Sequence, residues 1–178
     1  MTKTPSSEAV SVLIRAPTQH VVDEIARAFD DAVGVVSVAH NDGKVLAGGG
    51  STFMNLSKSL KEYATTIGGR AQLAVEAFAN ALEVIPATLA ENSGLDPVDS
   101  MIELRRAHSE SSDDAIYYGV NVYDGGVINM RDHGVIEPLK VVSQAIQSAT
   151  ETAAMLVRID DIITSKSQAQ IGDDGFEY

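Results

Sequence analysis

Apolar residues recur at helical spacing in five separate stretches of this 178-residue sequence. The stretches cover residues 22–36, 53–67, 73–85, 98–105 and 139–157. Side chains three or four positions apart lie on one face of an α-helix, so each stretch predicts a helix with an apolar side. Only 5% of the residues are aromatic, which favours an interior of aliphatic side chains and alanine. The expected fold class is therefore mostly α.

Residues that commonly begin or end helices bound these stretches. Thr18 can cap the first helix with its hydroxyl group, and Gly43 can end it. Gly68 is placed to end the second helix, and Asp96, which precedes a proline, can cap the fourth. Pro86 has no amide hydrogen, so we expect the third helix to break there and a loop to follow. These signals predict separate helices rather than one long one.

Other segments have the composition of strands. Residues 10–15 alternate between two faces, which predicts a strand. Residues 116–130 carry β-branched and aromatic side chains on both sides of Asp124-Gly125-Gly126, which predicts a β-hairpin. Residues 158–164 form a further candidate strand, and residues 165–178 are expected to be a loose tail. The expected architecture is a helical bundle that carries one hairpin, with a separate strand and helix before it.

Charge and residue types argue against several classes of function. The formal net charge of −12 opposes binding to nucleic acid or to an anionic membrane. The chain has no cysteine, and its four histidines are not spaced as metal ligands, so no metal site is predicted from either residue type. The sequence shows no uncharged apolar run of membrane-spanning length and no apolar core of a signal peptide near its start. We therefore expect a cytoplasmic protein.

Three consecutive glycines, Gly48–Gly50, precede the second expected helix. Ordering them costs about 2 to 3 kcal/mol relative to alanine, so some interaction must offset that cost. One interpretation is a tight turn, and the other is a bare backbone that lets a phosphate approach the helix N-terminus. The segment is not a Walker P-loop, because no Lys-Ser or Lys-Thr follows it. Since a helix N-terminus contributes only about 0.3 to 1 kcal/mol, an anion site here would need groups from other segments.

Asp31 enters a helical segment that is otherwise almost entirely apolar. No formally charged residue lies between it and Asp42. Burial would raise the pKa of such a carboxyl group unless donors or a cation stabilised its charge, which makes Asp31 a candidate general base or a group that orients a metal ligand. The alternative is that Asp31 faces solvent beside Asp30. Spacing alone leaves both interpretations open.

Two later segments supply a second group of candidates. Gly119–Val122 offer main-chain groups at a strand, and Glu137 lies between Ile136 and Pro138. A carboxylate can accept hydrogen bonds from two ribose hydroxyls, and Val122 and Ile136 could enclose a flat base. Taken alone, Glu137 is also explained as an acid at the start of a helix, where the helix dipole favours it.

Five motifs follow one another along the chain. They are "DDAVGVVSVAHNDGKVLAGGG", "LAENSGLDP", "GVNVYDGG", "GVIEPLKV" and "MLVRIDDII". In this order they resemble the C-terminal part of a group II chaperonin of the archaeal thermosome type, over residues 10–163. The resemblance implies a helical equatorial-domain bundle with a β-hairpin and a small α/β segment of the intermediate domain. It assigns residues 1–47 to the intermediate domain, residues 48–164 to the equatorial domain and residues 165–178 to a flexible tail.

The resemblance also implies roles for the candidate residues. Asp31 matches an aspartate that positions or activates the water that attacks the γ-phosphate of ATP. The glycine run matches one that contacts the nucleotide, Asn121 and Val122 fall where the family lines the adenine, and Glu137 falls where an acid meets the ribose. The nucleotide-binding candidates are thus Gly48, Gly49, Gly50, Gly119, Asn121, Val122 and Glu137.

The function implied by the resemblance is that of an ATP-dependent protein-folding chaperonin subunit. ATP or ADP and Mg²⁺ would be its cofactors, and its partners would be other subunits of a double ring and unfolded client proteins. Compared with the family, this sequence lacks the phosphate loop, the magnesium ligand near it and the apical client-binding domain. We therefore expect little or no ATP hydrolysis by this chain alone. The alternative is a stand-alone scaffold or interaction module without ATPase activity.

Overall fold

The computed structural model describes residues 2–3, 10–110 and 112–159 of the chain, and most of these residues are helical. The chain divides into two compact units, Met1–Val142 and Ser143–Tyr178. The core and the cavity described below belong to the first unit. The expected mostly α fold is confirmed.

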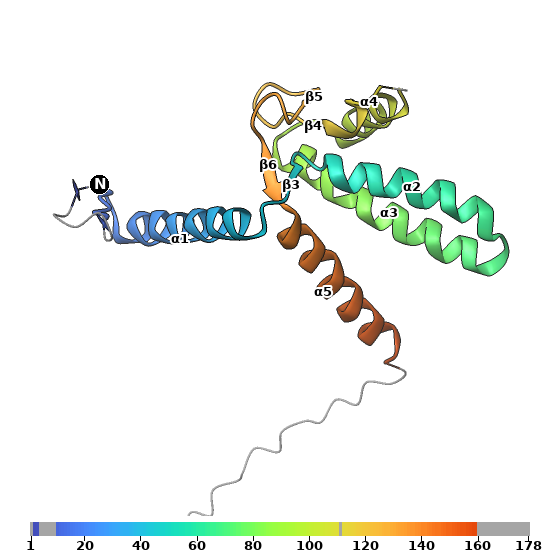
Figure 1. The fold of residues 1–178 in the computed structure, drawn as a ribbon, viewed down its shortest axis with the longest axis horizontal. Helices are drawn as coiled ribbons and strands as arrows, with labels where there is room; N and C mark the ends of the chain where they lie inside the picture. The colour runs from blue at the N-terminus through green and yellow to red at the C-terminus, as the bar shows by residue number, and fades with distance from the viewer. Residues whose placement is uncertain (1, 4–9, 111, 160–178) are drawn as a thin grey trace, which may run out of the picture. The chain divides into compact units, whose positions relative to one another are not determined.

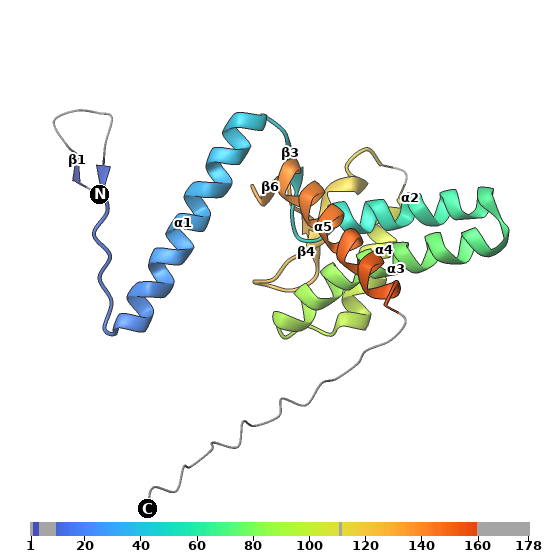
Figure 2. The ribbon, with the colours of Figure 1, turned by 90° about the horizontal axis from the view of Figure 1, so that it is seen from below.

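The first helix, α1, spans Gln19–Asp42 and has the predicted ends. The hydroxyl oxygen of Thr18 accepts a hydrogen bond from the amide of Val21, and Gly43 ends the helix with φ of 62°. Figure 2 shows α1 as one unbroken helix that leads through a short connection into strand β3, Val45–Ala47. None of the residues of α1 is buried in the described part of the chain.

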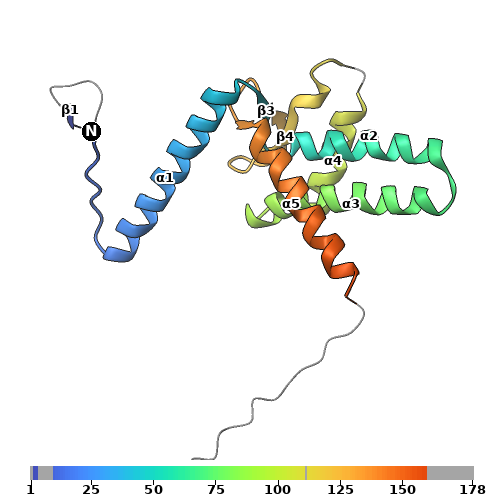
Figure 3. The ribbon, with the colours of Figure 1, turned by 60° about the horizontal axis from the view of Figure 1, so that its bottom comes forward.

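Helices α2 (Ser51–Ile67) and α3 (Gly69–Asn92) form an antiparallel pair that Gly68 connects, and the predicted end of the second helix at Gly68 is confirmed. The two helices lie side by side in Figures 1 and 3. Gly68 has φ of 68° and ψ of 174°, a conformation that glycine adopts without the steric penalty of a side chain. The close turn therefore fixes the pairing of the two helices.

The third helix does not break at Pro86, so that prediction was wrong. A proline inside a helix costs about 3 kcal/mol, yet α3 continues for six residues beyond it. Leu89 and Ala90, in the turn that follows, pack into the hydrophobic core. Pro86 is itself fully buried beside Gly50. Tertiary packing of the last turns thus outweighs the local preference of proline.

Helix α4, Pro97–Ser109, begins as the sequence predicted. The Asp96 carboxylate accepts hydrogen bonds from the amides of Val98 and Asp99, which satisfies two donors of the first turn. The helix packs against α2 and α3 and completes the core. The buried core cluster is made of Met54, Ala90, Met101, Leu104 and Val120. Three helices and one strand therefore share a single apolar interior.

Among the described residues, α3 is also the one helix that is long and apolar enough to cross a membrane by length and composition. Helices in the interior of a bundle have the same properties. Part of the surface of α3 contacts α2 and α4, and 28% of its most apolar 18-residue window is buried, whereas Leu73, Val84 and Ile85 are exposed. The helix also carries the ion-paired residue Glu83.

The strands are shorter than expected. The alternation over residues 10–15 forms only β2, Val10–Ser11, which pairs antiparallel with β1, Thr2–Lys3. Two-residue strands leave little room for a ladder, and Pro17 follows soon after. The candidate strand over 158–164 lies mostly outside the described residues, as does the expected tail over 165–178.

The predicted β-hairpin is confirmed, and a second pair of strands was not foreseen. Strands β4 (Tyr118–Val120) and β5 (Val127–Asn129) pair antiparallel after a short 3₁₀ turn. Strand β3 pairs with β6, Ile136–Pro138, with Leu46 opposite Glu137. The expected last helix, α5, begins directly after β6 and spans Leu139–Val157. The pairing of β3 with β6 thus joins segments that lie about ninety residues apart in the sequence.

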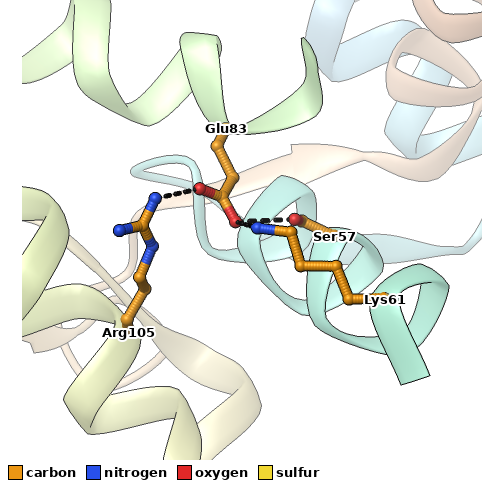
Figure 4. Close-up of polar contacts among 4 residues, drawn as sticks. All are labelled: Ser57, Lys61, Glu83 and Arg105. Atoms are coloured by element: carbon orange, nitrogen blue, oxygen red, sulfur yellow. Dashed lines mark hydrogen bonds and ion pairs between the residues drawn. The ribbon is translucent and has the colours of Figure 1, made fainter. Parts of the chain in front are cut away.

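A buried carboxylate joins the three helices of the bundle (Figure 4). Glu83 of α3 accepts a hydrogen bond from the hydroxyl of Ser57 at 2.7 Å and pairs with the Lys61 ammonium group at 2.5 Å, both from α2. Its second oxygen accepts from the guanidinium group of Arg105 of α4. The Glu83 side chain is only 9% exposed, whereas Lys61 and Arg105 keep contact with solvent.

Burial alone would raise the pKa of Glu83. The hydrogen bonds from Arg105, Lys61 and Ser57 together outweigh burial and hold the pKa below its ordinary value of 4.5. A lowered folded-state pKa means that the ionised carboxylate stabilises the fold at pH values above 4.5. That contribution is lost as the pH falls through the folded-state value.

We predict that Glu83→Gln lowers the free energy of unfolding at pH 7 by about 1 to 3 kcal/mol, because the amide cannot pair with two cations. Urea unfolding followed by circular dichroism at neutral pH and near pH 3 would measure this. The deficit should disappear at the acidic pH. Glu91→Gln, at an exposed position of the same helix, is the matched control. Equal stability of wild type and Glu83→Gln at pH 7 would contradict the predicted role of this cluster.

Candidate functional site

The turn of Gly48–Gly50 is held against strand β4 and the loop before β6 by main-chain hydrogen bonds. The Gly48 amide donates to the Val135 carbonyl oxygen, and the Val120 amide donates to the Gly49 carbonyl oxygen, each at 2.9 Å. Segments about seventy and ninety residues apart in the sequence therefore meet at this turn.

Gly119 permits the close approach of β4 to the turn. A Cβ atom at Gly119 would lie 2.8 Å from the carbonyl oxygens of both Gly48 and Gly49. Such contacts are shorter than van der Waals separation, and main-chain oxygens cannot move aside as a flexible side chain can. Glycine at this position is thus required by the contact between two stretches of backbone.

Protein atoms also occupy the space beside the other glycines. Gly49 and Gly50 have φ of 62° and 77°, which side chains other than glycine rarely adopt. A Cβ at Gly49 would lie 2.6 Å from the Met130 side chain, and one at Gly50 would lie 2.6 Å from Pro86. The cost of ordering the glycines is therefore offset by internal packing, as the tight-turn interpretation holds. Contact with a ligand remains a prediction.

A cavity of about 410 Å³ opens beside this turn. Its apolar walls are formed by Leu89, Val120, Val122, Ile128, Met130 and Val135. Its polar groups belong to Asn121, Tyr123, Asp124 and His133, and Gly49 contributes main chain. A mainly apolar hollow with few polar groups is typical of sites that hold a small organic molecule.

The structure brings together some of the candidate residues. Gly49, Asn121 and Val122 all line the cavity. Gly48 and Gly119 take part in the main-chain contact but do not line the cavity, and Gly50 lies against Pro86.

Sequence reasoning missed several residues that line the cavity, among them the apolar walls Leu89, Ile128, Met130 and Val135. Leu89 lies in the part of α3 that was expected to be a loop. Met130 is the last residue of the segment predicted as a hairpin and is only 2% exposed, but an isolated methionine carries no signal of such a position. A prediction that continued the helix past Pro86 would have placed Leu89 on α3. The position of Met130 depends on packing between segments far apart in the sequence.

Glu137 lies on β6, two residues after Val135, and is not itself among the residues that line the cavity. Its interpretation as an acid in the first turn of a helix is wrong, because it belongs to a strand and the first turn of α5 contains no acid. Its Oε1 atom is buried and has no hydrogen-bond partner within the described part of the chain. Burial raises the pKa of Glu137 above its ordinary value.

Asp31 lies on α1, away from these groups in the sequence. It is exposed, as the solvent-facing interpretation expects, and it does not line the cavity. Along the helix it lies about 16 Å before Asp42, since each helical residue advances about 1.5 Å. The described residues therefore do not join Asp31 to the other candidates.

One of the four histidines, His108, is buried. His108 is 3% exposed, and its Nε2–H group donates to the Tyr118 carbonyl oxygen at 2.8 Å. Burial is the main reason why the pKa of His108 is lowered. His108 thus joins α4 to β4 as a structural residue. Within the described ranges, no group of three or more potential metal-ligating His, Cys, Asp or Glu side chains occurs.

Comparison of the sequence with known proteins shows to which family the chain belongs. Residues 1–167 match the model of the TCP-1/cpn60 chaperonin family. The thermosome subunit of Methanocaldococcus jannaschii is 55% identical over 159 residues, which are 89% of this chain and 29% of that protein. The thermosome subunit alpha of Halobacterium salinarum is 50% identical over 170 residues, 94% of this chain and 30% of that protein.

A solved structure agrees with these sequence relatives. The open-state monomer of a group II chaperonin from Methanococcoides burtonii matches with a TM-score of 0.67 and 51% identity. The match covers 86% of this chain and 38% of that one. The chain thus spans about three-tenths of the length of the two thermosome subunits named above.

We predict that Gly119→Ala lowers the free energy of unfolding by about 1 to 3 kcal/mol, because the methyl group collides with two carbonyl oxygens. Gly34→Ala is the matched control, since Gly34 lies within α1 with no atom near the added methyl group. That change should be neutral or stabilising by up to about 1 kcal/mol. Thermal and urea unfolding measure both, and a Gly119→Ala chain as stable as Gly34→Ala would contradict the contact.

Proposed function

Because the chain belongs to the TCP-1/cpn60 chaperonin family, we propose that it forms the adenosine-binding part of the ATP site in an ATP-dependent protein-folding chaperonin subunit. The observation that carries this proposal is the buried, unpartnered Glu137 oxygen near an apolar cavity that adjoins the Gly48–Gly50 turn. A buried acceptor without a donor could bind the ribose hydroxyls of a nucleoside, and an apolar cavity could bind its base.

The cavity supports the placement of the base. Val120, Val122 and Ile128 supply branched aliphatic walls, and Leu89 contributes a further one. A flat heterocycle buries both of its faces against such walls and keeps its polar edge toward main-chain groups. In this proposal Val122 contacts the adenine, and Gly49, which has no side chain, leaves room for the base.

Glu137 supports the placement of the ribose. Its Oε1 atom has lost its hydration without gaining a donor, a costly arrangement for an ionised carboxylate. Two ribose hydroxyl groups would supply the donors and lower the pKa again. Glu137 lies on the strand that continues from Val135, one of the cavity walls, so the ribose would follow the base along β6.

The turn before α2 supports contact with the phosphates. Gly50 occupies the N-cap position and has no side chain that could cap the helix. Bare amides at a helix N-terminus attract negative charge, although this term amounts to only about 0.3 to 1 kcal/mol. In the whole subunit Mg²⁺ would neutralise the phosphate charge. The described residues include no cluster of three or more side chains that could hold Mg²⁺. We propose that the protein ligand of Mg²⁺ lies in a segment of the chaperonin subunit outside the described residues.

We further propose that Asp31 orients the attacking water when a family member closes around ATP. Its exposure on α1 leaves the carboxylate free to meet another segment. The proposed domain assignment places Asp31 in an intermediate domain (1–47) and the cavity in an equatorial domain (48–164). Assembly with other subunits in a ring, capture of unfolded proteins by an apical domain and a cytoplasmic location complete the proposal.

We predict that this chain binds adenosine and ADP, and that it prefers adenosine over 2′,3′-dideoxyadenosine by about tenfold because only adenosine offers hydroxyl donors to Glu137. Isothermal titration calorimetry measures both affinities. Glu137→Gln should reduce the preference, while Glu62→Gln, an exposed change on α2, should leave it intact. Equal affinity of wild type for the two nucleosides would contradict the ribose contact.

We predict that Glu137→Gln, which should reduce the preference for adenosine, stabilises the chain in the absence of a ligand. The raised pKa means that ionisation of Glu137 opposes folding as the pH rises above 4.5. The neutral amide should therefore raise the free energy of unfolding at pH 7, and the gain should vanish below pH 4.5. Urea unfolding at the two pH values checks this. A destabilised variant at pH 7 would show that the carboxylate is satisfied by the protein itself.

For Asp31 the expected result separates binding from turnover. In a chaperonin subunit that contains these residues together with its phosphate loop, Asp31→Ala should leave ADP affinity within about twofold and abolish ATP hydrolysis. Asp30→Ala is the neighbouring control and should retain hydrolysis. Loss of ADP binding in Asp31→Ala would indicate a structural role instead.

The alternative function, a scaffold or interaction module without ATPase activity, makes a different prediction. Such a chain would show no change in melting temperature with ADP or ATP. Its mass by size-exclusion chromatography with light scattering would not respond to Mg-ATP. A nucleotide-dependent shift in either measurement favours the ATP-binding proposal.

A further inference from the structure

Two loops that form the wall of the cavity begin in the same way. Asn121 directly follows β4, and Asn129 is the last residue of β5. The first loop contributes Asn121 and the three residues after it to the cavity, and the second contributes Met130, His133 and Val135. An asparagine therefore stands at the start of each loop that encloses the proposed base.

The side-chain oxygen of each asparagine is engaged by its own loop. Asn121 Oδ1 accepts hydrogen bonds from the amides of Tyr123 at 3.1 Å and Asp124 at 3.5 Å. Asn129 Oδ1 accepts from the amides two and three residues ahead, at 3.0 and 3.4 Å. This repeated pattern is an Asx turn, in which a side chain replaces a main-chain acceptor and fixes the first bend of a loop.

The rest of the first loop depends on that bend. The Asn121 amide donates to the Gly126 carbonyl oxygen, and the Gly125 amide donates to the Asn121 carbonyl oxygen. All the main-chain and side-chain acceptor groups of Asn121 are thus engaged within residues 121–126, and the same segment presents Val122 and Asp124 to the cavity.

We propose that Asn121 is a positioning residue, whose side-chain oxygen holds the 121–126 loop as a wall of the cavity instead of contacting the base, and that Asn129 does the same for the 130–135 loop. This inference rests on the proposed nucleotide site for its ligand, but the hydrogen bonds that carry it belong to the protein alone. It gives Asn121 a different role from that of a residue that donates to adenine.

Substitution by aspartate separates the two roles. Aspartate keeps an acceptor oxygen in the same place and removes the amide donor, whereas alanine removes both. A positioning role needs only the oxygen, so Asn121→Asp should retain function. A contact through the amide group needs the donor, so Asn121→Asp should fail as Asn121→Ala does.

The experiment measures adenosine affinity by calorimetry, since an uncharged nucleoside is not repelled by the added carboxylate as a phosphate would be. We expect Asn121→Ala to weaken adenosine binding about tenfold and Asn121→Asp to stay within about twofold of wild type. The pair Asn129→Ala and Asn129→Asp should repeat this pattern at the second loop. Asn80→Asp, an exposed change on α3, controls for added charge.

Hydrogen exchange of the Tyr123 and Asp124 amides provides a readout that needs no ligand. Exchange should quicken in Asn121→Ala and stay near the wild-type rate in Asn121→Asp. Adenosine binding by Asn121→Asp as weak as that of Asn121→Ala would overturn the positioning role, and so would unchanged exchange in Asn121→Ala. If wild type binds no adenosine, the proposed function fails, and the exchange data still decide whether the asparagine oxygen holds the loop.

Discussion

The tightest packing constraint in this structure is the main-chain contact between the Gly48–Gly50 turn and strand β4. It exists because Gly119 has no side chain and because the Val120 amide finds its acceptor on Gly49. The start of α2, the hairpin and the loop before β6 are all positioned by it. Apart from Leu89 of α3, the residues that line the cavity come from these same segments, so a contact that involves no charged side chain brings them together.

The helices were predictable because their signals are local. Thr18 and Asp96 act as caps, and Gly43 and Gly68 end their helices, as their chemistry indicates. The hairpin was likewise foreseen from its glycines. Pro86 misled because its local cost is real, but the burial of Leu89 and Ala90 depends on residues far away in the sequence. The pairing of β3 with β6 escaped notice for the same reason, since each strand has only three residues.

The candidate site was foreseen in its residue types more than in its geometry. Gly49, Asn121 and Val122 meet at the cavity, which supports grouping them. Two other expectations were incomplete. The glycines are explained by neighbouring protein atoms, and Asn121 directs its oxygen into its own loop. Spacing alone could reveal neither feature, because both depend on what approaches the residue in three dimensions.

Pro86 has a mechanical consequence for this arrangement. Its ring fills the place that a side chain on Gly50 would occupy, and its nitrogen leaves one main-chain acceptor of the preceding turn of α3 without the usual helical bond. A helix is easiest to bend where that ladder is interrupted. The turn next to the cavity therefore contacts α3, the longest helix in the bundle, at the point where this helix bends most easily. Displacement of the turn would change the curvature of α3.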